Sequence, residues 1–102
     1  LHVDDLINAF IFFLKKNKKK YDIFNVATDQ LITVNNISKI IFNVLKINPK
    51  ISYSGGAIGW KGDVSYIKLS NKKLKMIGWK YLYSTSKAVK KTVKDNINIY
   101  RN

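Results

Sequence analysis

The stretch Ser54-Gly55-Gly56-Ala57-Ile58-Gly59-Trp60-Lys61-Gly62-Asp63 is the part of the sequence around which the rest is arranged. It holds four of the chain's five glycines, with an aromatic ring, a cation and a carboxylate among them. Because glycine permits positive φ and lets the backbone approach a ligand closely, the stretch predicts a loop that contacts a polar molecule. The alternative is a surface connector whose Trp60 fills a gap in the core. Neither G-x-G-x-x-G nor G-x-x-x-x-G-K-[ST] can be laid on these glycines.

The composition indicates one small globular domain. The chain has 102 residues, of which 46% are hydrophobic and 13% aromatic, enough for one modest core. It contains no cysteine, which excludes disulfides, thiol chemistry and thiolate metal sites. No apolar run approaches the ~20 residues that span a bilayer, and no secretory signal is visible. We therefore expect a cytoplasmic protein with no membrane partner.

The charge is strongly positive, at +13 from 19 Lys and Arg against 6 Asp. Such an excess raises nucleic acid as a partner. The cations are almost all lysines spread along the chain, and Arg101 is the only residue suited to bidentate contacts with bases and phosphates. We expect the charge to be a compositional background rather than a nucleic-acid footprint. A small basic nucleic-acid-binding module stays open as the alternative function.

The first helix is expected to begin at Asp5, whose carboxylate would cap the first turn, and to run into Lys15 and Lys16. Its apolar face is formed by five residues at helical spacing: Leu6, Ala9, Phe10, Phe13 and Leu14. Three further apolar residues widen that face: Ile7, Ile11 and Phe12. The apolar face of this helix is too wide to be covered by one neighbouring element, which predicts that it also packs against a partner.

The rest of the chain reads as short strands and three more helices. Strands are expected at the start (1–3) and over 21–26, 50–53 and 64–69. Thr33 is the expected N-cap of a helix that Asn48-Pro49 stops. Ser70 is expected to cap a short helix through Met76, with Gly78 left-handed after it and Trp79 packed back upon it. Ser84 or Ser86 would cap a last helix with five inward residues: Ala88, Val89, Val93, Ile97 and Tyr100.

No active site follows from the residues alone. His2 is the only histidine, which leaves no metal cluster and no Ser-His-Asp set to argue. The chain has six carboxylates, most of which fall at expected caps or turns, where Asp is common on structural grounds. They are Asp4, Asp5, Asp22, Asp29, Asp63 and Asp95. We therefore expect neither a catalytic residue nor a metal site in this chain.

The order of five motifs is more specific than any one of them. They are, in chain order, His2-Val3-Asp4-Asp5, Phe24-Asn25-Val26-Ala27-Thr28, Thr33-Val34, Gly55 to Val64, and Ile77-Gly78-Trp79-Lys80. This series resembles the C-terminal lobe of NAD-dependent sugar-nucleotide epimerases and dehydratases, which are extended short-chain dehydrogenases, and the UDP-glucose 4-epimerase-like branch is the most similar. The resemblance covers nearly the whole chain.

The resemblance implies an α/β fold: a small lobe of about four helices with short strands, one truncated domain over 1–102, without the Rossmann domain. In the family that absent domain holds NAD and a catalytic Tyr-x-x-x-Lys pair, and the sugar is oxidised at C4 and reduced again. This chain has no NAD fingerprint, so no cofactor is expected in it. Tyr83 with Lys87 fits the Tyr-x-x-x-Lys spacing, but this pair follows the glycine-rich stretch 54–63, called the glycine loop below, and is interpreted as a chance match. We expect no epimerase activity from the chain alone.

The resemblance also places four residues where the family's loop meets the nucleotide-sugar, such as UDP-glucose: Trp60, Lys61, Gly62 and Asp63. Asp63 would accept a hydrogen bond from a ribose hydroxyl or close a turn within the loop. The family's diphosphate-binding Arg is replaced by Ile58, and its usual Pro by Ser65. A Rossmann-domain partner or a second copy is the expected protein partner. A non-catalytic remnant docked on a separate Rossmann subunit is the remaining alternative.

Overall fold

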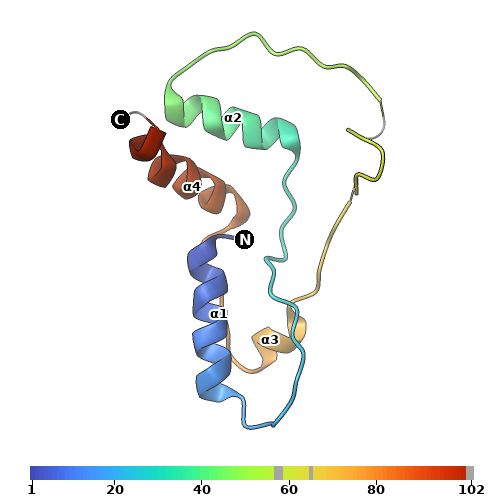
Figure 1. The fold of residues 1–102 in the computed structure, drawn as a ribbon, viewed down its shortest axis with the longest axis vertical. Helices are drawn as coiled ribbons and strands as arrows, with labels where there is room; N and C mark the ends of the chain where they lie inside the picture. Colours follow the sequence, from blue (N-terminus) through green and yellow to red (C-terminus); the bar gives the residue numbers. More distant parts are fainter. Residues whose placement is uncertain (57–58, 65, 101–102) are drawn as a thin grey trace.

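The computed structural model describes residues 1–56, 59–64 and 66–100, and its regular elements in that part of the chain are four helices. They are α1 (Val3–Lys16), α2 (Val34–Leu45), α3 (Lys72–Met76) and α4 (Thr85–Tyr100) (Figure 1). No strand occurs among the described residues, so the expected α/β class is wrong and the fold described here is all-helical.

The expected strands fail because none of them finds a partner. Segments 21–26 and 50–53 and the described part of 64–69 run as irregular backbone, and Val3 already belongs to α1. Their β-branched and aromatic residues favour an extended conformation, but a strand is stabilised only when a neighbour pairs with its backbone N–H and C=O groups. Local propensity therefore predicted extended chain in places where no sheet forms.

The N-cap of α1 lies three residues earlier than the sequence indicated. Nδ1 of His2 accepts a hydrogen bond from the backbone N–H of Asp4 at 3.1 Å, so His2 is the N-cap and the expected cap at Asp5 is wrong. The helix ends at Lys16 as expected, with Lys15 and Lys16 in the last turn, where cations suit the helix dipole. Only Asp5 and Ala9 are fully buried along it.

Helix α2 begins where the sequence predicted. Oγ1 of Thr33 accepts from the backbone N–H of Asn36 at 3.2 Å, which confirms Thr33 as its N-cap. The helix ends at Leu45, before the predicted stop at Asn48-Pro49, because Lys46 turns left-handed with φ of 55°. Its half-buried side packs against α4, the one pair of helices in extensive contact among the described residues (Figure 1).

The last two helices are set by their flanking residues. Asn71, not Ser70, occupies the N-cap position of α3, and its amide donates instead to the backbone C=O of Ala27 at 2.7 Å. Gly78 has φ of 105°, which confirms the left-handed residue expected after α3. Oγ of Ser84 accepts from the N–H of Lys87 at 3.4 Å, so Ser84 rather than Ser86 precedes α4 as its cap.

The core is small and joins α1 to α3 and the residues that follow α3. Ala9 of α1 packs with Leu74 of α3 and with Trp79, which is only 3% exposed and lies back on that helix as expected. Partly buried aromatic and apolar residues surround them: Phe12, Phe24, Val26 and Tyr81. Along α4, Ala88 is buried and Val89, Val93 and Ile97 are half-buried, whereas the side chain of Tyr100 lies outside the described residues.

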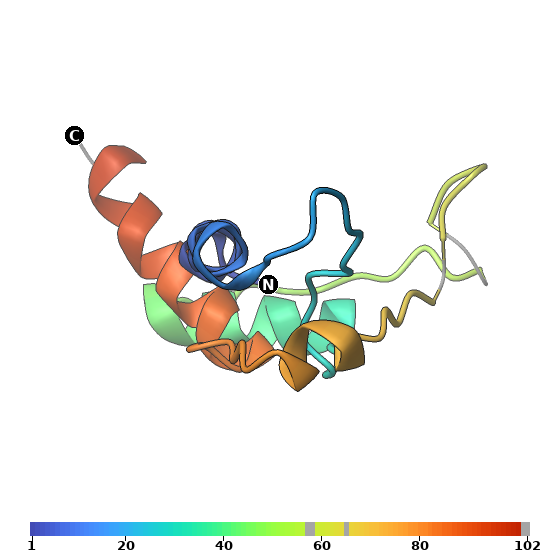
Figure 2. The ribbon, with the colours of Figure 1, turned by 90° about the horizontal axis from the view of Figure 1, so that it is seen from below.

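The molecule is open and thin. Its radius of gyration is 17.0 Å, against about 13 Å for a compact domain of this length. Its accessible surface is 8601 Å², against about 5,900 Å² for a compact monomer of this mass. The extents are 52 × 36 × 19 Å, and the described residues of the segment from α2 to α3 (46–56, 59–64 and 66–71) run out from the helices as a long arm (Figures 1 and 2).

Candidate functional site

The glycine loop lies in the arm, and its second half is a tight turn. The backbone N–H of Asp63 donates to the C=O of Trp60 at 3.0 Å, which closes the turn over Lys61 and Gly62. Gly62 has φ of 97°, a conformation that residues with a Cβ rarely adopt, and the Trp60 ring lies beside its Cα. The structure thus brings all four predicted site residues together in one turn and places Lys61 at its tip.

Trp60 is displayed rather than buried. It is 69% exposed, so the alternative in which it fills a gap in the core is wrong. The buried indole belongs to Trp79 instead. A large aromatic ring held at the surface offers a face on which a planar group can stack. Ala57, Ile58 and Ser65, which carry the rest of the loop's expected pattern, lie outside the described residues.

Asp63 is engaged within its own loop. Its Oδ2 accepts the backbone N–H of Gly59 at 3.2 Å, so of the two roles expected for Asp63 the loop-internal one is formed in the structure. A carboxylate has a second oxygen and further lone pairs, which leaves acceptor capacity for a hydroxyl. Lys61, exposed at the tip, supplies the only cation of the turn.

The most buried charge in the described chain is a structural one that sequence reasoning missed. Asp5 is 0% exposed, and its two carboxylate oxygens accept the backbone N–H groups of Leu82 at 2.6 Å and Tyr83 at 3.1 Å. The carboxylate thereby fastens α1 to the segment that leads into α4. No periodicity or spacing indicates this contact, because its partners are backbone groups of residues 82 and 83.

A second unpredicted cluster links Asp29, Lys75 and Tyr81. The Asp29 carboxylate accepts from Lys75 Nζ and, at 2.7 Å, from the Tyr81 hydroxyl. The hydrogen bond from Lys75 and then that from Tyr81 hold the pKa of Asp29 at about 2, and the same bonds raise the pKa of Lys75 and of Tyr81. The donors and the acceptor satisfy one another, so the cluster is a tie between segment 27–31 and α3 rather than a reactive group.

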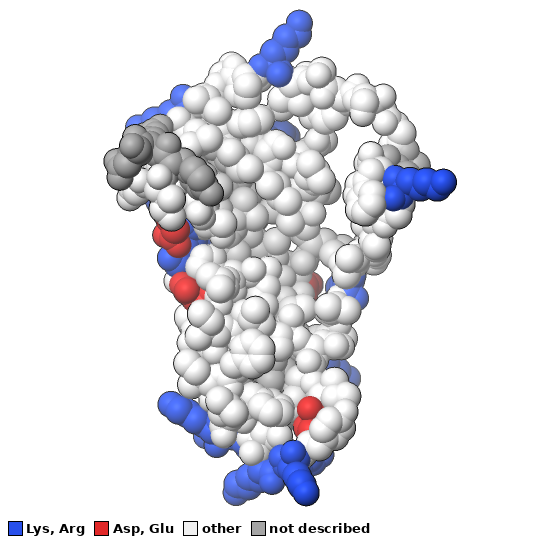
Figure 3. Space-filling model, in the orientation of Figure 1, with Lys and Arg blue, Asp and Glu red and all other residues white. Residues whose placement is uncertain are grey.

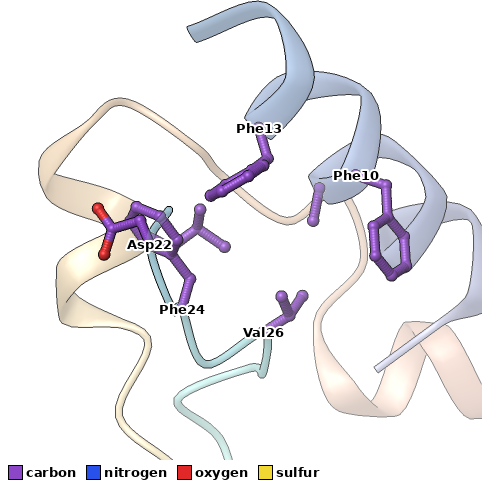
Figure 4. Close-up of a pocket in the computed structure, with 7 residues that line it drawn as sticks. Phe10, Phe13, Asp22, Phe24 and Val26 are labelled. Atoms are coloured by element: carbon purple, nitrogen blue, oxygen red, sulfur yellow. The ribbon is translucent and has the colours of Figure 1, made fainter. Parts of the chain in front are cut away.

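An apolar pocket of about 220 Å³ opens between α1, segment 22–26 and α3 (Figure 4). Its wall is largely aromatic and includes Phe10, Phe13 and Phe24. The carboxylate of Asp22 points away from the rings in Figure 4 and pairs with Lys73, a contact that lowers its pKa. Apart from Asp22, whose carboxylate is paired with Lys73, the described lining is apolar, so the pocket suits an apolar side chain.

The lysines do not form one continuous patch on the face shown in Figure 3. They stand at the edges of the molecule, and the middle of that face is uncharged. Several are neutralised in pairs, such as Lys91 with Asp95 at 2.7 Å and Lys19 with Asp22 at 3.6 Å. Duplex recognition by phosphate contacts requires several cations on one surface. That nucleic acid is not the partner stays a prediction.

The described residues do not fit the cofactor of the resembled family. A dinucleotide site needs a glycine turn between a strand and the N-terminus of a helix. Here the described residues between the glycine loop and α3, which begins at Lys72, run as irregular backbone. Within the described chain, no group of three or more His, Cys, Asp or Glu residues could hold a metal, and no helix has the length and apolar character to cross a membrane.

Comparison with protein-family models and with characterised proteins finds no significant match to this chain.

Proposed function

We propose that this chain contributes the nucleotide-sugar-binding loop of a sugar-nucleotide epimerase or dehydratase, with UDP-glucose as the representative ligand. The observation that carries the proposal is the display of Trp60 at 69% exposure on a glycine-shaped turn beside Lys61. The indole offers a stacking face to a base or sugar, and the ammonium group offers a point charge to a diphosphate. The order of motifs around the loop supports the ligand class.

The catalytic half of such an enzyme lies outside these residues. In the intact enzyme NAD would take a hydride from the sugar and return it, and a Rossmann domain would hold the NAD. That domain would belong to a separate chain or to another part of a longer protein. The open shape favours a second body: the accessible surface exceeds that of a compact monomer of this mass by about 2,700 Å². The purified chain supplied with NAD is expected not to turn over UDP-glucose. Turnover would contradict the proposal that the catalytic residues lie outside this chain.

Tryptophan fluorescence tests the binding role. The chain has two tryptophans, of which Trp60 is exposed and Trp79 is 3% exposed, so acrylamide should quench one fraction of the emission and spare the other. UDP-glucose is expected to change the quenchable fraction only. In Trp60→Phe the response to UDP-glucose should disappear, whereas the emission of Trp79 should remain.

Lys61→Ala provides the charge test. It should weaken UDP-glucose binding more than uridine binding, because it removes the cation assigned to the diphosphate. Lys50→Ala, another exposed lysine of the arm, is the matched control and should leave both affinities unchanged. An unchanged spectrum of the wild-type chain at saturating UDP-glucose would overturn the proposed binding role.

A further inference from the structure

The outer face of α1 has the spacing of a helix-pairing seam. Val3, Ile7, Phe10 and Leu14 follow one another at intervals of four, three and four residues, and Leu6 and Ile11 flank them. All six side chains are exposed in the single chain. Apolar residues at this alternating spacing form the stripe by which two helices pack together in coiled coils.

The same helix keeps its opposite face for the core. Asp5 and Ala9 are buried there, and Phe12 and Phe13 are half-buried beside them. Pairing through the outer face therefore requires no unfolding of the chain. The outer stripe also borders the apolar pocket, since Phe10 belongs to both (Figure 4).

The charges beside the stripe are self-complementary. Asp4 and Lys15 lie three turns apart on the same flank of α1, with Ile11 between them. When two copies of a helix pair antiparallel about a two-fold axis, each flank lies beside the same flank of the copy, reversed in direction. Asp4 of each copy then faces Lys15 of the other, whereas a parallel pair brings neither together. Within one chain Asp4 lies 3.8 Å from Lys91, and Lys15 of the copy would add a second cation beside it.

We propose that the occupant of this face is a second copy of the chain, paired through α1 in antiparallel orientation. Leu14 of one copy then lies opposite Val3 of the other, and Phe10 opposite Ile7. This inference does not depend on the nucleotide-sugar role, because the glycine loop belongs to the arm and not to α1.

Sedimentation equilibrium of the full chain tests the pairing. The wild type is expected at twice the mass of 11.8 kDa, and Ile7→Glu/Leu14→Glu at the monomer mass. Met76→Glu, a matched control at an exposed apolar residue of α3, should stay dimeric. Circular dichroism should show that each variant keeps its helices. A wild type that remains monomeric as its concentration is raised would overturn the proposal and leave the face to a different occupant, such as a Rossmann body.

Two further readouts test the orientation. Asp4→Lys and Lys15→Asp should each weaken the dimer several-fold, and the double swap should restore it. Because the chain has no cysteine, Val3→Cys and Leu14→Cys can be introduced singly. Oxidation of the two variants mixed together should give a disulfide-linked dimer, and oxidation of either alone should not. Crosslinking of either variant with itself, or none in the mixture, would contradict the antiparallel pair.

Discussion

At the scale of single residues, Asp5 shows how one carboxylate can hold two distant parts of a chain together. Its oxygens receive the N–H groups of Leu82 and Tyr83, and it has no exposed surface. Leaving buried donors unsatisfied costs more than a hydrogen bond contributes on balance, because the donors lose water without replacement. The position therefore matters for stability even though it touches no substrate.

Asp5→Asn is expected to lower the free energy of unfolding by about 1–3 kcal/mol, because the amide can accept only through one atom and turns its NH₂ toward a donor. Chemical denaturation measures the loss. Asp4→Asn, one residue earlier and 45% exposed, is the control and should change stability much less. Equal losses at both positions would show that the lost stability comes from the charge near the helix N-terminus and not from the hydrogen bonds of Asp5 with Leu82 and Tyr83.

Asp29 predicts an acid dependence of stability. Its pKa is about 2 in the folded chain against the ordinary 3.8, since Lys75 and Tyr81 donate to its ionised form. The stabilisation is therefore fully present above pH about 4, and it is lost as the pH falls toward about 2. Melting temperatures from pH 6 down to pH 2 should show a smaller acid loss in Asp29→Asn than in the wild type, and an identical loss would contradict the assignment.

At the scale of elements, the sequence predicted the helices better than the connections. The four helices were expected, and Thr33, Met76 and Gly78 were placed correctly, because caps and periodicity act within a few residues. The strands were wrong because pairing depends on segments distant in the chain. Asp5 was misread for the same reason: its local position suits a cap, but its partners are Leu82 and Tyr83.

For the candidate site, too, the sequence predicted the local backbone but not the packing. The glycines correctly indicated a turn with positive φ, whereas the choice of side chains for the site came from the resemblance and stays a prediction. The exposure of Trp60 could not be read from sequence, since the same residues suit a buried plug. Trp79 fills the core instead, and only the packing of α1 against α3 decides between the two rings.

The end of α2 offers an element-scale prediction. Lys46 adopts φ of 55°, where a side chain with a Cβ is strained and glycine is not. Lys46→Gly should raise the free energy of unfolding by about 0.5–1 kcal/mol, because the relief of strain exceeds the entropy that glycine adds to the unfolded chain. Denaturant titration measures the gain. Lys50→Gly, in the arm without a positive φ, should give none, and a gain there too would point to a different cause.

At the scale of the whole molecule, the chain spreads its residues over too large a surface to bury them. The core holds few fully buried residues, and large apolar side chains are exposed on α1, along the arm and around α3. Exposed apolar side chains that gather in a patch mark interaction sites in natural proteins. We therefore expect a partner surface to complete this open shape.

Small-angle X-ray scattering tests that shape. Measured on Ile7→Glu/Leu14→Glu, so that single chains are observed, the radius of gyration should be near 17.0 Å. A value near 13 Å would mean that the arm collapses onto the helices, as in a compact domain of this length. Met76→Glu, in which the outer face of α1 is unchanged, should scatter as a larger particle than the double variant.

The arm also separates the chain into halves that are interlocked. α1 and α2 precede it, and α3 and α4 follow it, yet α1 packs with Leu74 and Trp79 while α2 packs with α4. Cleavage of the chain near Gly62 would therefore give two polypeptides, neither of which contains a core of its own. Mixed together, they would have to reconstitute both helix contacts at once. The fold is thus suited to fragment complementation, in which two separately produced pieces gain structure only in each other's presence.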